Sequence, residues 1–303
     1  KKKIFFILSA VVIIAGFVTM GVHKGNGGDA LNYSLEFKGG TSTSVEFNED
    51  MSIEELDEKV VPIIEEISKD ANVQTQKVQG SNQVIFKSAT LDVSQREELN
   101  SRLEEEFGVD PEKITAETIS STISSEMRTG AVSAVVVSTV LMLLYVWFRF
   151  KDVRFGASSV AALVHDVLVV LAFYAAARVS VGNTFIACML TIVGYSINAT
   201  IVIFDRIREN MTSYKTKEEL AAIVNRSISQ TLSRSIFTSL TTFIMVAVLY
   251  ILGVSSIKEF ALPLMVGIAC GTYSSICLAS AFWYLLRTRV GGKKAEKNKK
   301  AAK

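Results

Sequence analysis

The chain alternates long apolar runs with polar segments that carry most of its charge. A membrane-spanning helix needs about 20 predominantly apolar residues. Runs that approach or exceed this length occur at residues 4–22, 129–148, 156–177, 184–204, 236–252 and 260–286. The fifth run is short and the sixth is long. The pattern therefore predicts six membrane-spanning helices.

The first apolar run follows three lysines, and a secretory signal peptide also begins in this way. No small-residue cleavage site follows the run, which is long enough to cross a bilayer. We therefore interpret residues 1–22 as a retained first helix.

Lysine and arginine gather in the segments that should share one side of the membrane. They precede the first run, separate the second from the third and the fourth from the fifth, and fill the tail at 287–303. The opposite short loops carry only Arg178 and Lys258. By the positive-inside rule, both termini are expected in the cytoplasm and residues 23–128 outside.

Residues 23–128 have the pattern of a folded α+β domain. A strand with a Gly-Gly break is expected at 32–47, a helix capped by Ser52 at 52–70, and a hairpin at 73–89. A second helix, closed by Gly108, and a last strand at 113–120 follow. This β-α-β-β-α-β order predicts a ferredoxin-like domain. It contains no visible catalytic constellation, so a binding or mechanical role is favoured.

Residues 216–235 place apolar side chains along one helical face and polar ones along the other. This pattern predicts an amphipathic helix at the cytoplasmic interface. The alternative is a basic connector without that structure.

Composition narrows the class of protein further. Hydrophobic residues make up 49% of 303 residues and the mean hydropathy is +0.34, which is too apolar for an ordinary soluble protein. Cys188, Cys270 and Cys277 all lie in apolar runs and form no CxxC pair, so they are expected to be small buried hydrophobic residues, with no disulfide framework or zinc site. Motifs of nucleotide hydrolysis, zinc proteases and serine hydrolases are absent from the sequence, so an ion gradient is the expected energy source.

The third run contains two ionisable residues, His165 and Asp166, about 15 Å along the helix from Gly156 and hence near mid-membrane. Ionisable groups at that depth are costly and need a partner or a purpose. The two residues are adjacent, face about 100° apart and need not touch. A proton path and a hydrogen-bonded helix contact both remain open.

The fourth run contains a polar stripe. Gly194 and Asn198 share one face of the helix, and Ser196 and Thr200 share another. Asp205 lies near the cytoplasmic end, where a solvated or paired surface charge is expected. Arg234, at the start of the fifth run, could extend to the interface or reach a buried acid.

The sixth run contains a small-residue pair, Gly267 and Gly271, followed by Ser274 and Ser275. Glycines four residues apart let two membrane helices approach closely, so we expect helix packing here and at Gly194.

Six motifs, in order along the chain, resemble those of the SecF family, the smaller half of the bacterial SecD–SecF export component. They are FKGGT (37–41, with Phe37, Gly39, Gly40 and Thr41), LVHDV (163–167), TIVGYSIN (191–198), TIVIFDRIREN (200–210), SRSIFTSLTT (233–242) and GTYSS (271–275). The resemblance covers nearly the whole chain. It implies an RND-type half with six spans and a ferredoxin-like extracytoplasmic domain, in the bacterial inner membrane.

The resemblance also implies a function. With SecD, as a separate chain or as the other half of a fused one, the protein would use the proton motive force to promote translocation of an unfolded polypeptide after the SecA ATPase step. The SecYEG channel, YajC, YidC and membrane lipid are the other implied partners. No nucleic acid, metal, catalytic residue or cofactor besides the proton is implied. The alternative is a scaffold that stabilises SecD and the channel without ion coupling.

One position departs from the family pattern. The fourth-span motif usually reads Asn-Asp-Thr, and here it reads Asn198-Ala199-Thr200. The resemblance makes Ala199 the site of the family's relay acid and Arg234 the arginine beside it, with His165 and Asp166 nearby. Impaired proton conduction is therefore expected. A natural loss would account for Ala199, but a change confined to the central acid favours an engineered substitution.

Overall fold

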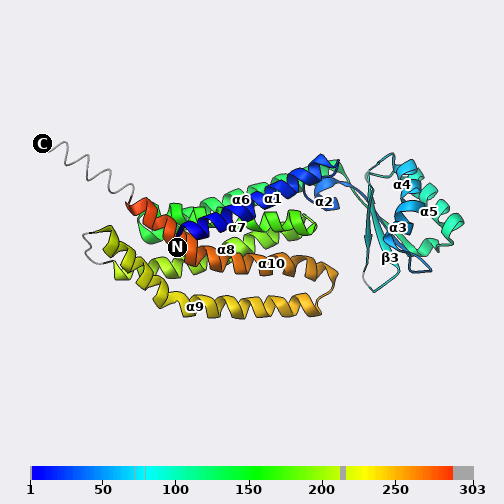
Figure 1. The fold of residues 1–303 in the computed structure, drawn as a ribbon. Coiled ribbons are helices and arrows are strands. Elements are labelled where there is room, and N and C mark those ends of the chain that lie inside the picture. Colours follow the sequence, from blue (N-terminus) through cyan, green and yellow to red (C-terminus); the bar gives the residue numbers. More distant parts are fainter. Residues whose placement is uncertain (1, 72, 79, 212–215, 289–303) are drawn as a thin grey trace. The chain divides into compact units, whose positions relative to one another are not determined.

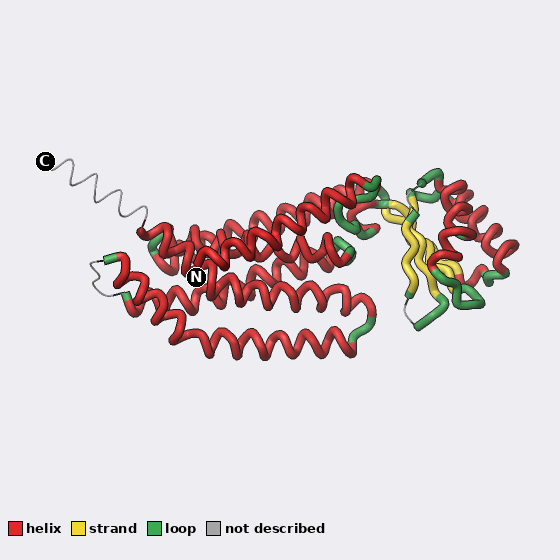
Figure 2. Tube along the Cα trace, viewed as in Figure 1, coloured by secondary structure: helices red, strands yellow, loops and turns green. Residues whose placement is uncertain are grey.

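A computed structural model describes residues 2–71, 73–78, 80–211 and 216–288 (Figure 1). Most of the predicted tail at 287–303 lies outside these residues. The chain forms two compact units, one made of Tyr33–Val132 and the other of Lys1–Asn32 with Ser133–Lys303. The first contains all the strands of the described chain, and the second is helical (Figure 2).

The sheet of the first unit has four strands in the order β2-β3-β1-β4, and all neighbours are antiparallel. Thr43 at its centre lies opposite Phe86 on one side and Ala116 on the other. The strands are β1 (Gly40–Glu46), β2 (Gln74–Lys77), β3 (Gln83–Ser88) and β4 (Ile114–Ile119).

Four α-helices and a short 3-10 turn accompany this sheet. They are α2 (Leu35–Lys38), α3 (Ile53–Lys59), α4 (Val61–Ser68), α5 (Val93–Phe107) and the turn η1 (Pro111–Lys113). The core between α3–α5 and the sheet is apolar, and its fully buried members include Val45, Leu56, Ile64, Phe86, Leu99 and Leu103.

The structure corrects two predicted boundaries in this unit. The first half of the predicted strand at 32–47 is the helical turn α2, and β1 begins only at Gly40. The predicted helix at 52–70 is two helices, because Pro62 at the start of α4 has no N–H and clashes with a preceding turn.

Two capping boxes begin the longer helices of this unit. Ser52 and Glu55 cap α3 reciprocally, and Asp92 and Gln95 do the same for α5. Gly108 ends α5 in the left-handed conformation, at φ 63°. The backbone N–H of Ser52 donates to Glu55 and lowers its pKa, and the backbone N–H of Gln95 lowers the pKa of Asp92 in the same way.

The second unit holds helices long and apolar enough to cross a membrane, and six such helices lie within the described chain. Each extends beyond its predicted run. They are α1 (Lys2–Gly25), α6 (Ser121–Phe150, which begins in the first unit), α7 (Val153–Ala177), α8 (Asn183–Asn210), α9 (Lys217–Leu252) and α10 (Ser255–Tyr273). The last continues as a π-helix, η2 (Ser274–Ala279), and runs on to Thr288.

Helices α7, α8 and α10 form the interior of the bundle, whereas α1, α6 and α9 are more exposed. Four aromatic rings join α6, α7, α8 and the end of the α10 span. The Phe155 ring lies 5.0 Å from Phe150 and 4.9 Å from both Phe204 and Trp283, measured between centroids.

The amphipathic helix predicted at 216–235 and the span predicted at 236–252 are one continuous helix, α9. Thr216 caps it in a capping box with Glu219, and it contains no glycine or proline before Gly253. Without a helix breaker near residue 235, the backbone hydrogen bonds continue through the expected boundary.

A buried carboxylate inside the helix bundle

Asp166 is the most deeply buried carboxylate of the bundle, with 1% of its surface exposed. Its Oδ2 atom accepts hydrogen bonds from the hydroxyls of Ser196 on α8, at 2.6 Å, and Ser274 at the start of η2, at 2.7 Å. These bonds join three segments at one oxygen and satisfy a group that would otherwise be costly in an apolar interior.

The other oxygen, Oδ1, faces His165 and Cys270. It lies 3.0 Å from Nδ1 of His165 and 3.3 Å from Sγ of Cys270. Adjacency in sequence did not require His165 and Asp166 to touch, but the structure brings them together. The Nε2 atom of His165 is buried and has no hydrogen-bond partner within the described chain.

Close packing of α10 against α8 makes this cluster possible. A Cβ atom added at Gly267 would lie 2.2 Å from Ile192 Cδ1, and one at Gly271 would lie 3.2 Å from Ser196 Cβ. Gly194 has nothing within 4 Å of its would-be Cβ. The close helix contact predicted for all three glycines is therefore found at Gly267 and Gly271 and not at Gly194.

The two consecutive serines that begin the π-helix η2 have different partners. Ser275 lies 2.9 Å from Thr200, hydroxyl to hydroxyl, and donates to the Ser196 carbonyl at 3.1 Å. Ser274 meanwhile donates to Asp166. π-Helical turns are often found at functional sites. Here the π-helix contacts Ser196 and Thr200, which lie one helical turn apart on the same face of α8.

The residues around position 199 differ in how far they are exposed at the surface of the bundle. Thr200 is buried, Ala199 is half-buried, and Asn198 is exposed on the bundle surface. Arg234 is also exposed, and no hydrogen bond or ion pair involves it within the described residues. The bundle thus gathers Asp166, His165 and Thr200 in one network and leaves Asn198 and Arg234 outside it.

Of two further residues, Asp205 agrees with its sequence-based interpretation and Cys270 differs from it. Asp205 forms an ion pair with Arg149 on α6, at 2.7 Å, and so is a paired charge at a helix end. Cys270 is half-buried and contacts Asp166 instead of packing only as an apolar residue. The sequence feature that could have indicated this contact is the position of Cys270, four residues before Ser274 on the same helical face.

The FKGGT residues (37–41) form a closely packed junction between helix α2 and strand β1 in the first unit. Phe37 is buried, and a Cβ on Gly40 (φ 123°) would lie 2.2 Å from the Ser88 carbonyl oxygen, so only glycine fits there. Gly39 also has a positive φ, of 78°. Thr41 accepts a hydrogen bond from the Leu91 amide at 2.8 Å.

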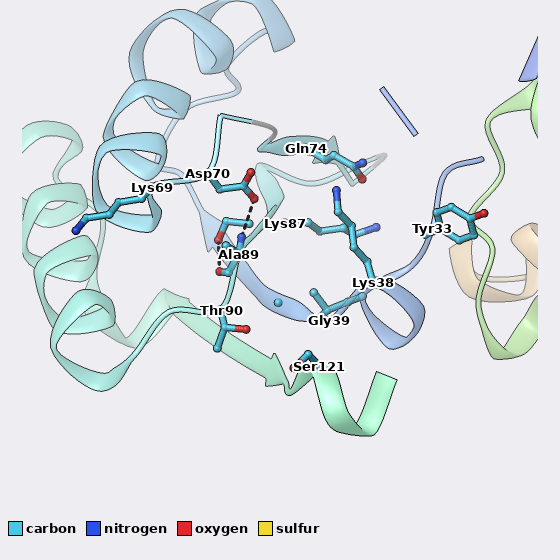
Figure 3. A pocket seen from close by; sticks show the side chains of 13 residues that line it. Tyr33, Lys38, Gly39, Lys69, Asp70, Gln74, Lys87, Ala89, Thr90 and Ser121 are labelled. Carbon is cyan, nitrogen blue, oxygen red and sulfur yellow. Dashed lines mark hydrogen bonds between the residues drawn. The ribbon is translucent and has the colours of Figure 1, made fainter. Parts of the chain in front are cut away.

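A surface cavity of about 340 Å³ adjoins this junction (Figure 3). The carboxylate of Asp70 accepts a hydrogen bond from the Ala89 amide at its wall, at 2.8 Å. Lys38 and Lys87 line it as well. Its described lining contains no histidine, cysteine or nucleophile–base pair, and we assign it no chemistry.

Six spanning helices around a hydrogen-bonded carboxylate, joined to an α+β unit, define a multi-pass membrane protein. A family model described as "Protein export membrane protein SecD/SecF, C-terminal" matches residues 99–289. The chain belongs to this SecD/SecF family of protein translocase subunits.

The relatives include SecF subunits of about the length of this chain and much longer SecDF subunits. The protein translocase subunit SecF of Sebaldella termitidis is 36% identical over 99% of this chain and 94% of its own. The SecDF subunit of Thermus thermophilus is 37% identical over 96% of this chain but only 39% of its own. A crystal structure of SecDF from Thermus thermophilus, titled a translocon-associated membrane protein, matches with a TM-score of 0.77 and 35% identity, over 95% of this chain and 38% of that one.

Proposed function

We propose that this chain is a SecF-type subunit of the bacterial Sec translocase. Together with SecD, it uses the proton motive force to promote preprotein translocation through SecYEG and release outside, after the SecA ATPase step. It lies in the inner membrane with both termini in the cytoplasm. YajC and YidC are further partners on this proposal. The names of the relatives support the translocase role and the SecD partner.

One observation carries the proposal of a SecD partner: two polar side chains are exposed on spanning helices. Asn198 lies near the middle of α8, and Arg234 lies about 27 Å from the Leu252 end of α9. A charge at the centre of the bilayer costs roughly 2.5–3.5 kcal/mol on insertion scales and less toward either face, and polar side chains on spanning helices rarely face lipid. A second helical half that covers this face would remove that cost, and transporters built from two repeats place their sites at such an interface.

The first unit is proposed to be a ferredoxin-like domain on the extracytoplasmic side that engages the emerging polypeptide. Its β2-β3-β1-β4 order and antiparallel pairing support the fold. The lysine and arginine distribution of the loops supports the location.

Ala199 is proposed to interrupt proton transfer in this chain. Its methyl group cannot titrate, and it lies between exposed Asn198 and buried Thr200, at the boundary of the polar network and the proposed SecD face. A carboxylate at this position would stand beside that network. The chain is therefore expected to fold and bind SecD while conducting few protons.

The test is proton uptake by vesicles that contain this chain with SecD, compared with Ala199→Asp and the non-titrating control Ala199→Asn. Uptake by the Asp form alone would support a relay at position 199. Equal uptake by all three would place the relay elsewhere, with Asp166 the next candidate.

A scaffold function is the second candidate, because the missing acid at Ala199 suits a subunit without ion coupling. It predicts that none of the three forms conducts protons while export assistance persists. That result would reject proton coupling and retain the structural role.

A further inference from the structure

Three potential metal ligands of different chemistry meet inside the bundle. The Nδ1 atom of His165, an oxygen of Asp166 and the Sγ atom of Cys270 all lie within 4.8 Å of one another. His165 and Asp166 are buried, and Cys270 is half-buried. The residues come from α7 and α10, so only the packed bundle brings them together.

The distances are close to those of a tetrahedral zinc site. Zinc binds histidine nitrogen and carboxylate oxygen at about 2.0–2.2 Å and thiolate sulfur at about 2.3 Å, so tetrahedral ligands lie roughly 3.3–3.6 Å apart. Here Nδ1 of His165 and Oδ1 of Asp166 are 3.0 Å apart, and Sγ of Cys270 lies 3.3 Å from Oδ1 and 3.9 Å from Nδ1. Movements of a few tenths of an ångström would bring these distances to the tetrahedral values.

We propose that His165, Asp166 and Cys270 form a binding site for a borderline-soft divalent metal ion, Zn²⁺ by its ligand set. Nitrogen, oxygen and sulfur donors together suit zinc better than magnesium or calcium, which prefer oxygen alone. The proposal does not rest on proton coupling at position 199, which lies outside the three-ligand cluster.

The charges of the three ligands suit a divalent cation. A divalent cation bound by one carboxylate, one thiolate and a neutral imidazole forms a group with no net charge, which a membrane interior tolerates far better than an isolated ion. Binding breaks the S–H bond of Cys270 and releases that proton to solvent, with no change in oxidation state. The neutral His165 ring carries its proton on Nε2 in the bound form, which frees the Nδ1 lone pair for the metal.

Two serines outside the three-ligand cluster hold the Asp166 carboxylate in position. Ser196 and Ser274 both donate to Oδ2 of Asp166, at 2.6 and 2.7 Å, which leaves Oδ1 turned toward the nitrogen and the sulfur. Hydrogen bonds to a ligand of this type orient it and raise metal affinity.

A groove adjoins the cluster and offers room for a fourth ligand. A groove of about 460 Å³ between α1, α7, α9 and α10 is lined by both His165 and Cys270. Three protein ligands with one open position are typical of zinc sites that hold a water or another small ligand.

The test uses the full chain in lipid nanodiscs, stripped with a chelator and then given Zn²⁺ or Co²⁺ alone. We expect one metal ion per chain by elemental analysis and, with Co²⁺, a thiolate-to-metal charge-transfer absorption band. Cys270→Ser should abolish that band, and Ser274→Ala should weaken binding by about 10- to 100-fold. Cys277→Ser, which removes a half-buried thiol outside the cluster, is the matched control and should bind as the parent does.

A second measurement does not depend on folding of the variants. In the unaltered chain, bound Zn²⁺ should slow alkylation of Cys270 and leave Cys277 unaffected. Absence of stoichiometric metal, or a charge-transfer band that persists in Cys270→Ser, would overturn the proposal and leave a hydrogen-bonded cluster only.

Discussion

The hydroxyl of Ser196 donates a hydrogen bond to Asp166 at 2.6 Å. Ser196 lies three residues before Ala199 on the same helix, α8. This bond fixes the rotation of α8 relative to α7. The same face of α8 is held again at Thr200 by Ser275. The direction in which position 199 points therefore depends on a network that does not include it.

Replacing Asp166 with alanine should lower the free energy of unfolding by about 2–4 kcal/mol, because Ser196 and Ser274 lose their acceptor in an apolar interior. Detergent unfolding titrations with a chelator present would measure it. Asp205→Ala, which breaks a half-exposed ion pair, should cost less than about 1 kcal/mol. Equal losses for the two variants would contradict the role given to Asp166.

Gly267→Ala should destabilise the bundle by about 1–3 kcal/mol, because the added methyl overlaps the buried side chain of Ile192. Gly194→Ala is the matched control, since its position is open and alanine favours helix. The same unfolding titration compares them. A loss at Gly194 as large as that at Gly267 would show that helix packing differs from the arrangement described.

Phe155→Ala should cost about 3–5 kcal/mol, because this ring packs against three others at the ends of four helices. In a Trp147→Phe background, the fluorescence of buried Trp283 should shift to the red. Phe237→Ala removes a ring that is 65% exposed and should leave both stability and fluorescence nearly unchanged.

Acid should loosen the starts of α3 and α5. The pKa values of Glu55 and Asp92 are lowered in the folded state, so their stabilising effect is present above the ordinary carboxyl pKa and is lost as the pH falls through the lower folded-state pKa. Below about pH 4, hydrogen exchange at the Ser52 and Gln95 amides, which donate to the two carboxylates, should accelerate relative to the sheet.

The control for this pH effect is the pair Glu55→Ala and Asp92→Ala. Each removes one capping box, so exchange at that helix start should already be fast at neutral pH and respond less to acid. An unchanged pH response in both variants would assign the effect to other carboxylates.

Arg234→Leu should weaken association with SecD by about tenfold or more while making membrane insertion of the chain easier. The reason is that this exposed cation is proposed to face the partner rather than lipid. Co-purification from membranes measures the association. Arg226→Leu, on the same helix nearer its start at Lys217, should leave SecD binding intact.

Several features follow from local patterns alone. The apolar runs indicate where the six spans lie, and Ser52 and Gly108 mark a helix start and a helix end in the α+β unit. These signals are readable because hydrophobic length, capping and glycine conformation act over a few residues. The same reasoning placed a boundary near residue 235 that α9 does not have, because an amphipathic and an apolar segment can share one unbroken helix.

The sequence by itself determined which polar residues stand in apolar runs, and so identified His165, Asp166, Asn198 and Arg234 as residues to explain. Only the tertiary structure decided which of them meet. Asp166 finds Ser196, Cys270 and Ser274 because Gly267 and Gly271 let α10 approach α8, whereas Arg234 lies on the outer face of α9. Helical periodicity states which face of a helix a side chain occupies, but not which other helix packs against that face.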